Sequence, residues 1–184
     1  MASISERENR EIEAANSSGN TPVVFIYGLW LLPGSWASWA DFFQQAGYAP
    51  LAPDWPDDPE TVEQARANLG ILARKTLEQV ADHTTEIINA LDKEPVVMGH
   101  STGGLPAQML AGRGLAAATV AIDSGVFRGV LPLPASVLRG VGPFLVNPLT
   151  RGRAITLTFG QFTYGWANAW ARRKRNSSRG RRRR

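Results

Sequence analysis

The most constraining feature of the sequence is an apolar run beginning at Val96 that ends abruptly in Gly99-His100-Ser101-Thr102-Gly103-Gly104. This motif has the pattern Gly-x-Ser-x-Gly and is followed by a segment of helical character. A serine on a tight strand-to-helix turn has strained backbone angles, and the residues two before and two after it lie so close that side chains would clash. Gly99 and Gly103 meet that demand. The pattern predicts a sharp turn that exposes the Ser101 hydroxyl, and the alternative is an ordinary glycine-rich turn.

Apolar periodicity places this turn within an alternation of strands and helices. Strands are predicted at residues 22–28, at 48–53, from Val96 to the turn, and at 116–122. Helices are predicted from Ser35 or Ser38 to Ala46, at 60–68, at 76–91, and from Leu105 to the glycines at 112 and 114. Because strands that alternate with helices form parallel sheets with right-handed crossovers, we expect an α/β fold with helices on both faces of the sheet.

Composition divides the chain into four parts. Residues 1–20 are polar and predict a mobile leader with a short helix around Arg7 to Ala15, whereas residues 21–126 carry the strand and helix pattern of the core. Residues 127–170 are rich in Gly, Pro, Leu and Phe, with weak helical pieces at 135–139 and 158–171, which indicates a lid above the core. The last part, residues 171–184, is a basic tail that we expect to be disordered.

The charge of the chain is concentrated in that tail. The formal net charge is +4, but residues 171–184 hold 9 of the 20 Lys and Arg residues and no acidic residue. Without the tail, 11 basic residues face 16 acidic ones, a net charge of −5. A basic tail gives salt-sensitive affinity for nucleic acid or anionic surfaces, which is the alternative function. We expect no specific nucleic-acid partner, because no aromatic residue is interleaved among the arginines.

The sequence also narrows the compartment and the chemistry. It contains no cysteine, so disulfide and thiolate chemistry are excluded. Its start lacks an apolar segment of signal-peptide length, and no run approaches the ~18 apolar residues of a membrane span. We therefore expect a cytoplasmic protein.

Four motifs together resemble the α/β-hydrolase superfamily over residues 21 to about 170. They are Val-Phe-Ile-Tyr-Gly-Leu-Trp at 24–30, Trp-Pro-Asp-Asp-Pro-Glu-Thr at 55–61, Gly-His-Ser-Thr-Gly-Gly at 99–104 and Ala-Ile-Asp at 121–123. Their order and spacing are most similar to small bacterial serine esterases and non-haem haloperoxidase-like proteins. The resemblance implies that Ser101 is the nucleophile and that the main-chain N–H groups of Leu29 and Thr102 form the oxyanion hole. It implies structural roles for Gly28, Gly99, His100 and Gly103.

The chain departs from the superfamily pattern in three places. Tyr27-Gly28 stands where relatives usually have His-Gly, and we expect this change to loosen the loop that positions Leu29. The triad acid and the triad histidine of the family both belong to elements expected downstream of residue 170. We therefore interpret the chain as C-terminally truncated, with a tail that would be explained by a frameshift in GC-rich coding sequence.

Three residues of the sequence bear on the missing roles. Asp123 ends a predicted strand and is a candidate for the catalytic acid, the alternative being a structural aspartate that caps the next turn. His100 is the residue before Ser101 in the Gly-x-Ser-x-Gly turn, the nucleophile elbow of the superfamily. It is expected to point into the packing beside Ser101, so it is disfavoured as the base. His83 is expected to be a half-exposed structural histidine of the long helix. Without a base, a serine is a weak nucleophile, and we expect a nearly inactive monomer.

The function implied is hydrolysis of carboxylic esters through an acyl-enzyme on Ser101. The substrate would be a small-molecule ester with an apolar acyl or aryl group, because Leu29 and Trp30 crowd the oxyanion loop and Phe127 comes from the lid. Plain core packing is the alternative for the tryptophan-rich loop. No cofactor and no metal are expected, because water completes the turnover.

Overall fold

The computed structural model describes residues 3–59, 61–68, 70, 73, 75–126, 139, 153 and 155–165. The chain divides into two compact units, Met1–Arg128 and Gly129–Arg184. In the second unit, the helix α7 spans Phe159–Gly165, within the range where a weak helix is predicted. Phe127, most of the predicted lid and the basic tail lie outside the described residues.

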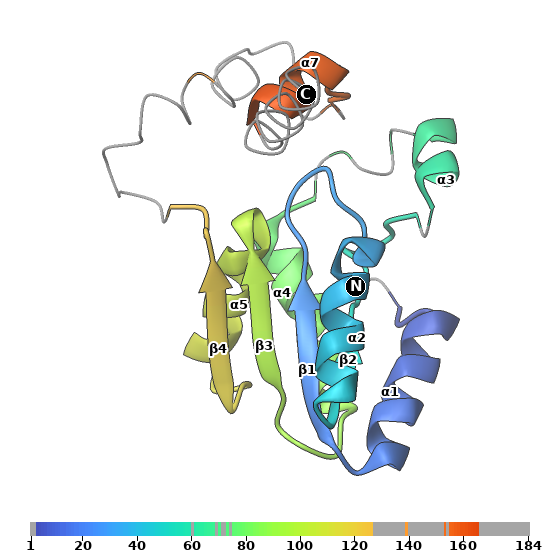
Figure 1. The fold of residues 1–184 in the computed structure, drawn as a ribbon, viewed down its shortest axis with the longest axis vertical. Coiled ribbons are helices and arrows are strands. Elements are labelled where there is room, and N and C mark those ends of the chain that lie inside the picture. The colour runs from blue at the N-terminus through green and yellow to red at the C-terminus, as the bar shows by residue number, and fades with distance from the viewer. Residues whose placement is uncertain are drawn as a thin grey trace, which may run out of the picture. The chain divides into compact units, whose positions relative to one another are not determined.

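The first unit is built on a four-stranded parallel sheet with the order β2-β1-β3-β4 (Figure 1). The strands are β1 (Thr21–Ile26), β2 (Tyr48–Leu51), β3 (Val96–His100) and β4 (Ala118–Ile122). Residues 22–26 of β1 are all buried, as expected for an apolar run that is covered on both faces. The predicted parallel α/β fold is confirmed.

Helices cover both faces of this sheet (Figure 1). The short 3₁₀ helix η1 (Pro33–Trp36) and α2 (Ala37–Gln45) lie on one face, where the Trp36 ring stacks on Phe25 of β1 at 4.8 Å. The helices α4 (Leu77–Asn89) and α5 (Gly104–Gly112) lie on the other face, and α3 (Val62–Ala67) precedes α4 in the chain. Thr76 caps α4 through a reciprocal hydrogen bond pair with Gln79, so this helix begins where the sequence predicts.

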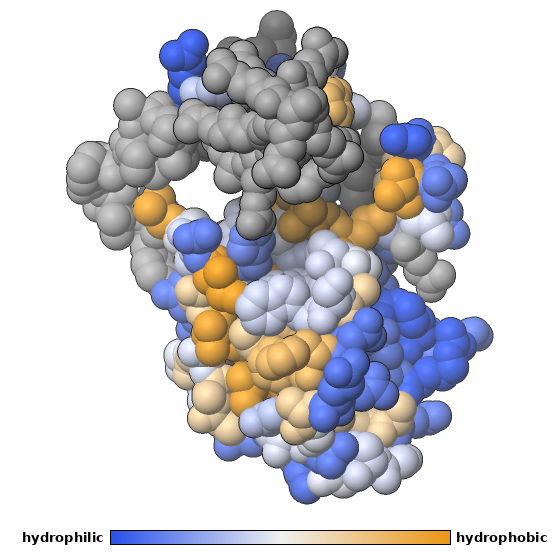
Figure 2. Space-filling view, viewed as in Figure 1, coloured by the Kyte–Doolittle hydropathy of each residue, from blue (hydrophilic) through white to orange (hydrophobic). Residues whose placement is uncertain are grey.

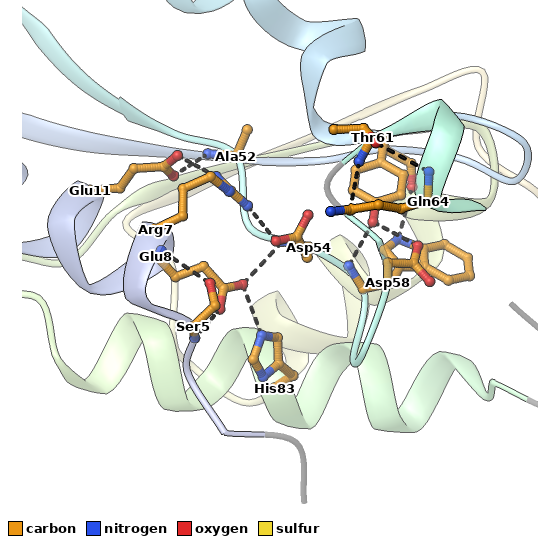
Figure 3. A network of polar contacts seen from close by, with 12 residues as sticks. Ser5, Arg7, Glu8, Glu11, Ala52, Asp54, Asp58, Thr61, Gln64 and His83 are labelled. Atoms are coloured by element: carbon orange, nitrogen blue, oxygen red, sulfur yellow. Dashed lines mark hydrogen bonds and ion pairs between the residues drawn. The ribbon is translucent and has the colours of Figure 1, made fainter. Parts of the chain in front are cut away.

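The N-terminal segment differs from the mobile leader expected from its polarity. Residues Glu6–Ser18 form α1, which packs against β2 and buries Ile12 and Ala15. Two carboxylates of α1 accept hydrogen bonds from the chain that follows β2: Glu8 from the Asp54 N–H at 3.0 Å and Glu11 from the Ala52 N–H at 3.2 Å (Figure 3). Part of the polar character of this segment therefore reflects hydrogen bonds to the chain just after β2.

The opposite edge of the sheet carries exposed apolar surface. Among the described residues, no strand pairs with the outer edge of β4, and Val120 in this strand is 41% exposed. Figure 2 shows orange and pale-orange surface on the face that carries α2, and blue surface over α1. The unpaired apolar edge of β4 favours association with other chains.

Within the described part of the chain, no helix is long and apolar enough to cross a membrane. The cytoplasmic location expected from the sequence stays a prediction.

Candidate active site

The Gly-x-Ser-x-Gly motif forms a sharp turn between β3 and α5. β3 ends at His100, the 3₁₀ helix η3 spans Ser101–Gly103, and α5 begins at Gly104. Ser101 has a φ of 54°, in the left-handed region that residues with a side chain rarely adopt. Strain of this kind costs about 1–3 kcal/mol and is found most often at functional sites.

Close backbone contacts explain why glycine flanks the serine. A Cβ atom at Gly99 would lie 2.2 Å from the Gly103 carbonyl oxygen, and one at Gly103 would lie 2.3 Å from the carbonyl oxygen of Ile26 in β1. A Cβ atom at Gly28 would lie 2.9 Å from the Ser101 Cβ and 3.3 Å from its Oγ. The loop after β1 therefore starts in contact with the serine.

That loop presents apolar side chains to solvent. The Leu31 N–H donates to the Gly28 carbonyl at 3.3 Å, which closes a turn in which Trp30 has a φ of 63°. Leu29 is 45% exposed and Trp30 37%, whereas Trp36 is buried in the core. The tryptophan-rich loop thus combines core packing, at Trp36, with an exposed apolar surface, at Leu29 and Trp30.

Asp123 follows β4 as Ser101 follows β3. His100 pairs with Ile122 in the parallel register. Ser101 and Asp123, the next residue of each chain segment, therefore occupy equivalent positions at the carboxyl edge of the sheet. Asp123 also has a positive φ, 44°, and its side chain makes no hydrogen bond or ion pair within the described residues. The Gly125 N–H donates to the Ser101 carbonyl at 3.0 Å, which ties the loop after β4 to the elbow.

Neither of the two histidines makes a hydrogen bond with the Ser101 hydroxyl. The His100 ring lies edge-on to Trp36, with centroids 6.5 Å apart, on the face covered by α2. His83 is 4% exposed, more buried than expected, and its ring contacts Glu8 of α1. In the described ranges, no group of three or more His, Cys, Asp or Glu side chains is placed to hold a metal ion.

The buried partner of His83 is Glu8. His83 Nε2 lies 2.9 Å from Glu8 Oε1, and the Ser5 N–H donates to Glu8 Oε2 at 2.8 Å (Figure 3). Burial alone would raise the pKa of Glu8, but the hydrogen bonds from His83 and Ser5 outweigh it and lower this pKa to about 2. His83 therefore belongs to the attachment of α1 and lies outside the serine site.

A second polar cluster, which the sequence motifs do not indicate, is centred on Tyr27, the residue before Gly28. The Tyr27 hydroxyl donates to Asp58 Oδ2 at 2.9 Å and accepts from the Trp55 N–H at 2.6 Å. Lys75 forms an ion pair with Asp58. The sequence signal was the Trp-Pro-Asp-Asp-Pro segment at 55–59, whose partner in the fold is not visible in the sequence.

A parallel α/β sheet with a strained serine between its third strand and the following helix defines the class of α/β proteins that carry a nucleophile elbow. The chain belongs to the alpha/beta hydrolase family, whose model matches residues 23–183. No curated protein gave a match to the chain.

Solved structures share this fold. An extracellular alpha/beta-hydrolase from a Paenibacillus species is 22% identical, with a TM-score of 0.56, and the match covers 78% of this chain and 57% of that one. The monoacylglycerol lipase of Paleococcus ferrophilus is 20% identical, with a TM-score of 0.49, over 72% of this chain and 60% of that one. The chain thus spans about 60% of the length of these enzymes.

Proposed function

We propose that this chain carries a serine hydrolase site that acts on carboxylic esters through an acyl-enzyme on Ser101. The observation that carries the proposal is the strained Ser101 at the end of β3, with its Oγ beside Gly28. The N-terminus of α5 adds a positive dipole end behind the serine. Membership of the alpha/beta hydrolase family supports the same chemistry.

In the proposed reaction, Ser101 Oγ attacks the ester carbonyl carbon and its proton passes to a base. The oxyanion of the tetrahedral intermediate accepts hydrogen bonds from the main-chain N–H groups of Leu29 and Thr102. The C–O bond to the alcohol then breaks, the alcohol takes up a proton, and water releases the acid from the acyl-enzyme. The reaction needs no cofactor.

The described residues place no histidine as a general base for Ser101. The chain holds two histidines, and His83 and His100 both have other surroundings. Asp123 is the proposed acid on the strength of its position beside the elbow, with a structural role in the turn as the alternative. Loss of a triad member costs several orders of magnitude in rate, so we propose that the chain by itself is nearly inactive.

The substrate proposal rests on the exposed loop after β1. Leu29 and Trp30 offer apolar surface next to the proposed oxyanion position, which favours small esters with an apolar acyl or aryl group. Phe127, the third predicted pocket residue, lies outside the described residues.

A fluorophosphonate probe tests the proposal, because labelling requires an activated serine. We expect slow labelling of the full chain that Ser101→Ala abolishes and that Ser35→Ala, a change at an exposed serine of η1, leaves intact. Mass spectrometry of the labelled peptide identifies the site. Equal labelling of the Ser101→Ala variant would show that this serine is not the nucleophile. No labelling of the wild type would show that the serine is not activated, which also contradicts the proposal.

A further inference from the structure

The side chain of Tyr27 is held at its hydroxyl and along its ring. Tyr27 is 1% exposed, its hydroxyl bridges Asp58 and the Trp55 N–H, and its ring stacks on the Trp55 ring at a centroid distance of 5.8 Å. The expectation that Tyr27 loosens the loop does not hold here, because a phenol is long enough to reach partners in the segment after β2. Figure 3 shows Asp58 within this set of polar contacts.

The main chain of Tyr27 is held as well. The Trp55 indole Nε1–H donates to the Tyr27 carbonyl oxygen at 3.2 Å. Gly103 of the elbow approaches the same carbonyl so closely that a Cβ atom there would lie 2.4 Å from the oxygen. The peptide that joins Tyr27 to Gly28 is therefore fixed from the side of the Trp55 loop and from the side of the elbow.

The next peptide carries the proposed oxyanion donor. The Gly28 carbonyl accepts from the Leu31 N–H at 3.3 Å, and the N–H at the other end of that peptide belongs to Leu29. Because a peptide unit is planar, holding its carbonyl also sets the direction of its N–H. Two consecutive carbonyls, at Tyr27 and Gly28, are thus fixed immediately before the donor.

We propose that Tyr27 and Trp55 are positioning residues, which hold the loop at Gly28 so that the Leu29 N–H is directed at the oxyanion before substrate binds. The inference rests on the proposed hydrolase function and adds a role to residues that do not touch the substrate. Preorganised donors cost no rearrangement during the reaction, and this is the benefit that such an anchor supplies.

The Asp58 carboxylate, which is paired with Lys75, keeps the Tyr27 hydroxyl protonated and able to donate. The side chains of Lys75 and Asp58 form an ion pair at 11% and 6% exposure. Burial raises the pKa of Tyr27, and the charge of the Asp58 carboxylate raises it further, so the hydroxyl stays protonated and donates to Asp58. Lys75 lies directly before the Thr76 cap, which connects the anchor to the start of α4.

Conservative variants separate anchoring from packing. Trp55→Phe keeps an aromatic ring and removes the indole donor together with some ring volume, and Tyr27→Phe keeps the ring and removes the hydroxyl. Asp54→Asn is the matched control, because Asp54 lies in the same segment and pairs with Arg7 without a hydrogen bond to Tyr27. In fluorophosphonate inactivation, we expect kinact to fall by about 10- to 100-fold in both test variants with KI unchanged, because positioning acts on the reacting geometry.

A second measurement keeps the test independent of activity. Amide hydrogen exchange at residues 29–32 should become about tenfold faster in Trp55→Phe and Tyr27→Phe than in the control, while residues 23–26 of β1 keep their protection. Unchanged loop exchange together with a control-like kinact overturns the positioning role. Absent labelling of the wild type overturns the proposed function, and faster loop exchange in that case still supports the anchor.

Discussion

At the scale of single residues, the elbow combines one strained residue with neighbours that have no side chain. Ser101 holds a φ of 54° while Gly99 and Gly103 approach backbone atoms to distances that exclude a Cβ. This conformation is held by its surroundings, because the turn joins β3 to α5 and lies against the backbone at the end of β1. The glycine positions could be predicted from the motif, since the requirement is local.

Gly103→Ala tests this close approach. The added Cβ would meet the carbonyl oxygens of Ile26 and Tyr27 at 2.3 and 2.4 Å, and a strand backbone cannot move aside cheaply. We expect the free energy of unfolding to fall by about 1–3 kcal/mol or more in urea denaturation. Gly112→Ala, in α5 with no atom within 4 Å of the new Cβ, is the control and should gain about 0.5–1 kcal/mol. Wild-type stability in the Gly103→Ala variant would contradict the packing described for the elbow.

At the scale of elements, α1 is attached through buried charge. Glu8 is 3% exposed and is bonded to His83 of α4 and to the Asp54 N–H, and Arg7 of the same helix pairs with Asp54 at 2.6 Å. Burial raises the pKa of Asp54, an effect that the Arg7 hydrogen bond opposes. Three of the charged side chains that made this segment look like a free leader, those of Arg7, Glu8 and Glu11, are thus paired with the rest of the fold.

The Glu8 carboxylate should make the stability of the fold depend on pH. Because its pKa is lowered from 4.5 to about 2 in the folded chain, its contribution is complete above pH 4.5 and is lost as the pH falls toward 2. We expect the stability difference between wild type and Glu8→Gln to shrink by about 3 kcal/mol between pH 6 and pH 2.

Denaturant unfolding at several pH values measures this difference, and Glu6→Gln is its control. Glu6 lies on the same helix with its side chain 97% exposed, so its variant should follow the wild-type curve across the same pH range. A stability difference for Glu8→Gln that is constant with pH would argue against a charged, paired Glu8.

At the scale of the whole molecule, charge is segregated along the chain. The net charge is +4 with residues 171–184 and −5 without them, although the family model extends to residue 183. The acidic remainder contains the serine site and the α1 attachment. Any affinity for polyanions should therefore depend on the tail.

Deleting residues 171–184 distinguishes the hydrolase proposal from the nucleic-acid alternative. We expect the full chain to be retained on heparin at low salt and the deletion variant to pass through, because counterion release drives such binding. Fluorophosphonate labelling of Ser101 should be the same in both. Retention of the deletion variant at equal salt would mean that the core itself binds polyanions.

The sequence by itself was sufficient for the strands, for the core helices and for the elbow. These features depend on local rules: an apolar run for a buried strand, side chains 3 or 4 residues apart for a helix face, and glycine where backbones touch. The tertiary structure was needed for the attachment of α1, the burial of His83 and the anchoring of Tyr27. Their partners lie 75 residues apart for Glu8 and His83, and 31 for Tyr27 and Asp58. Contacts over such separations arise only when packing brings the elements together, and no local pattern records them.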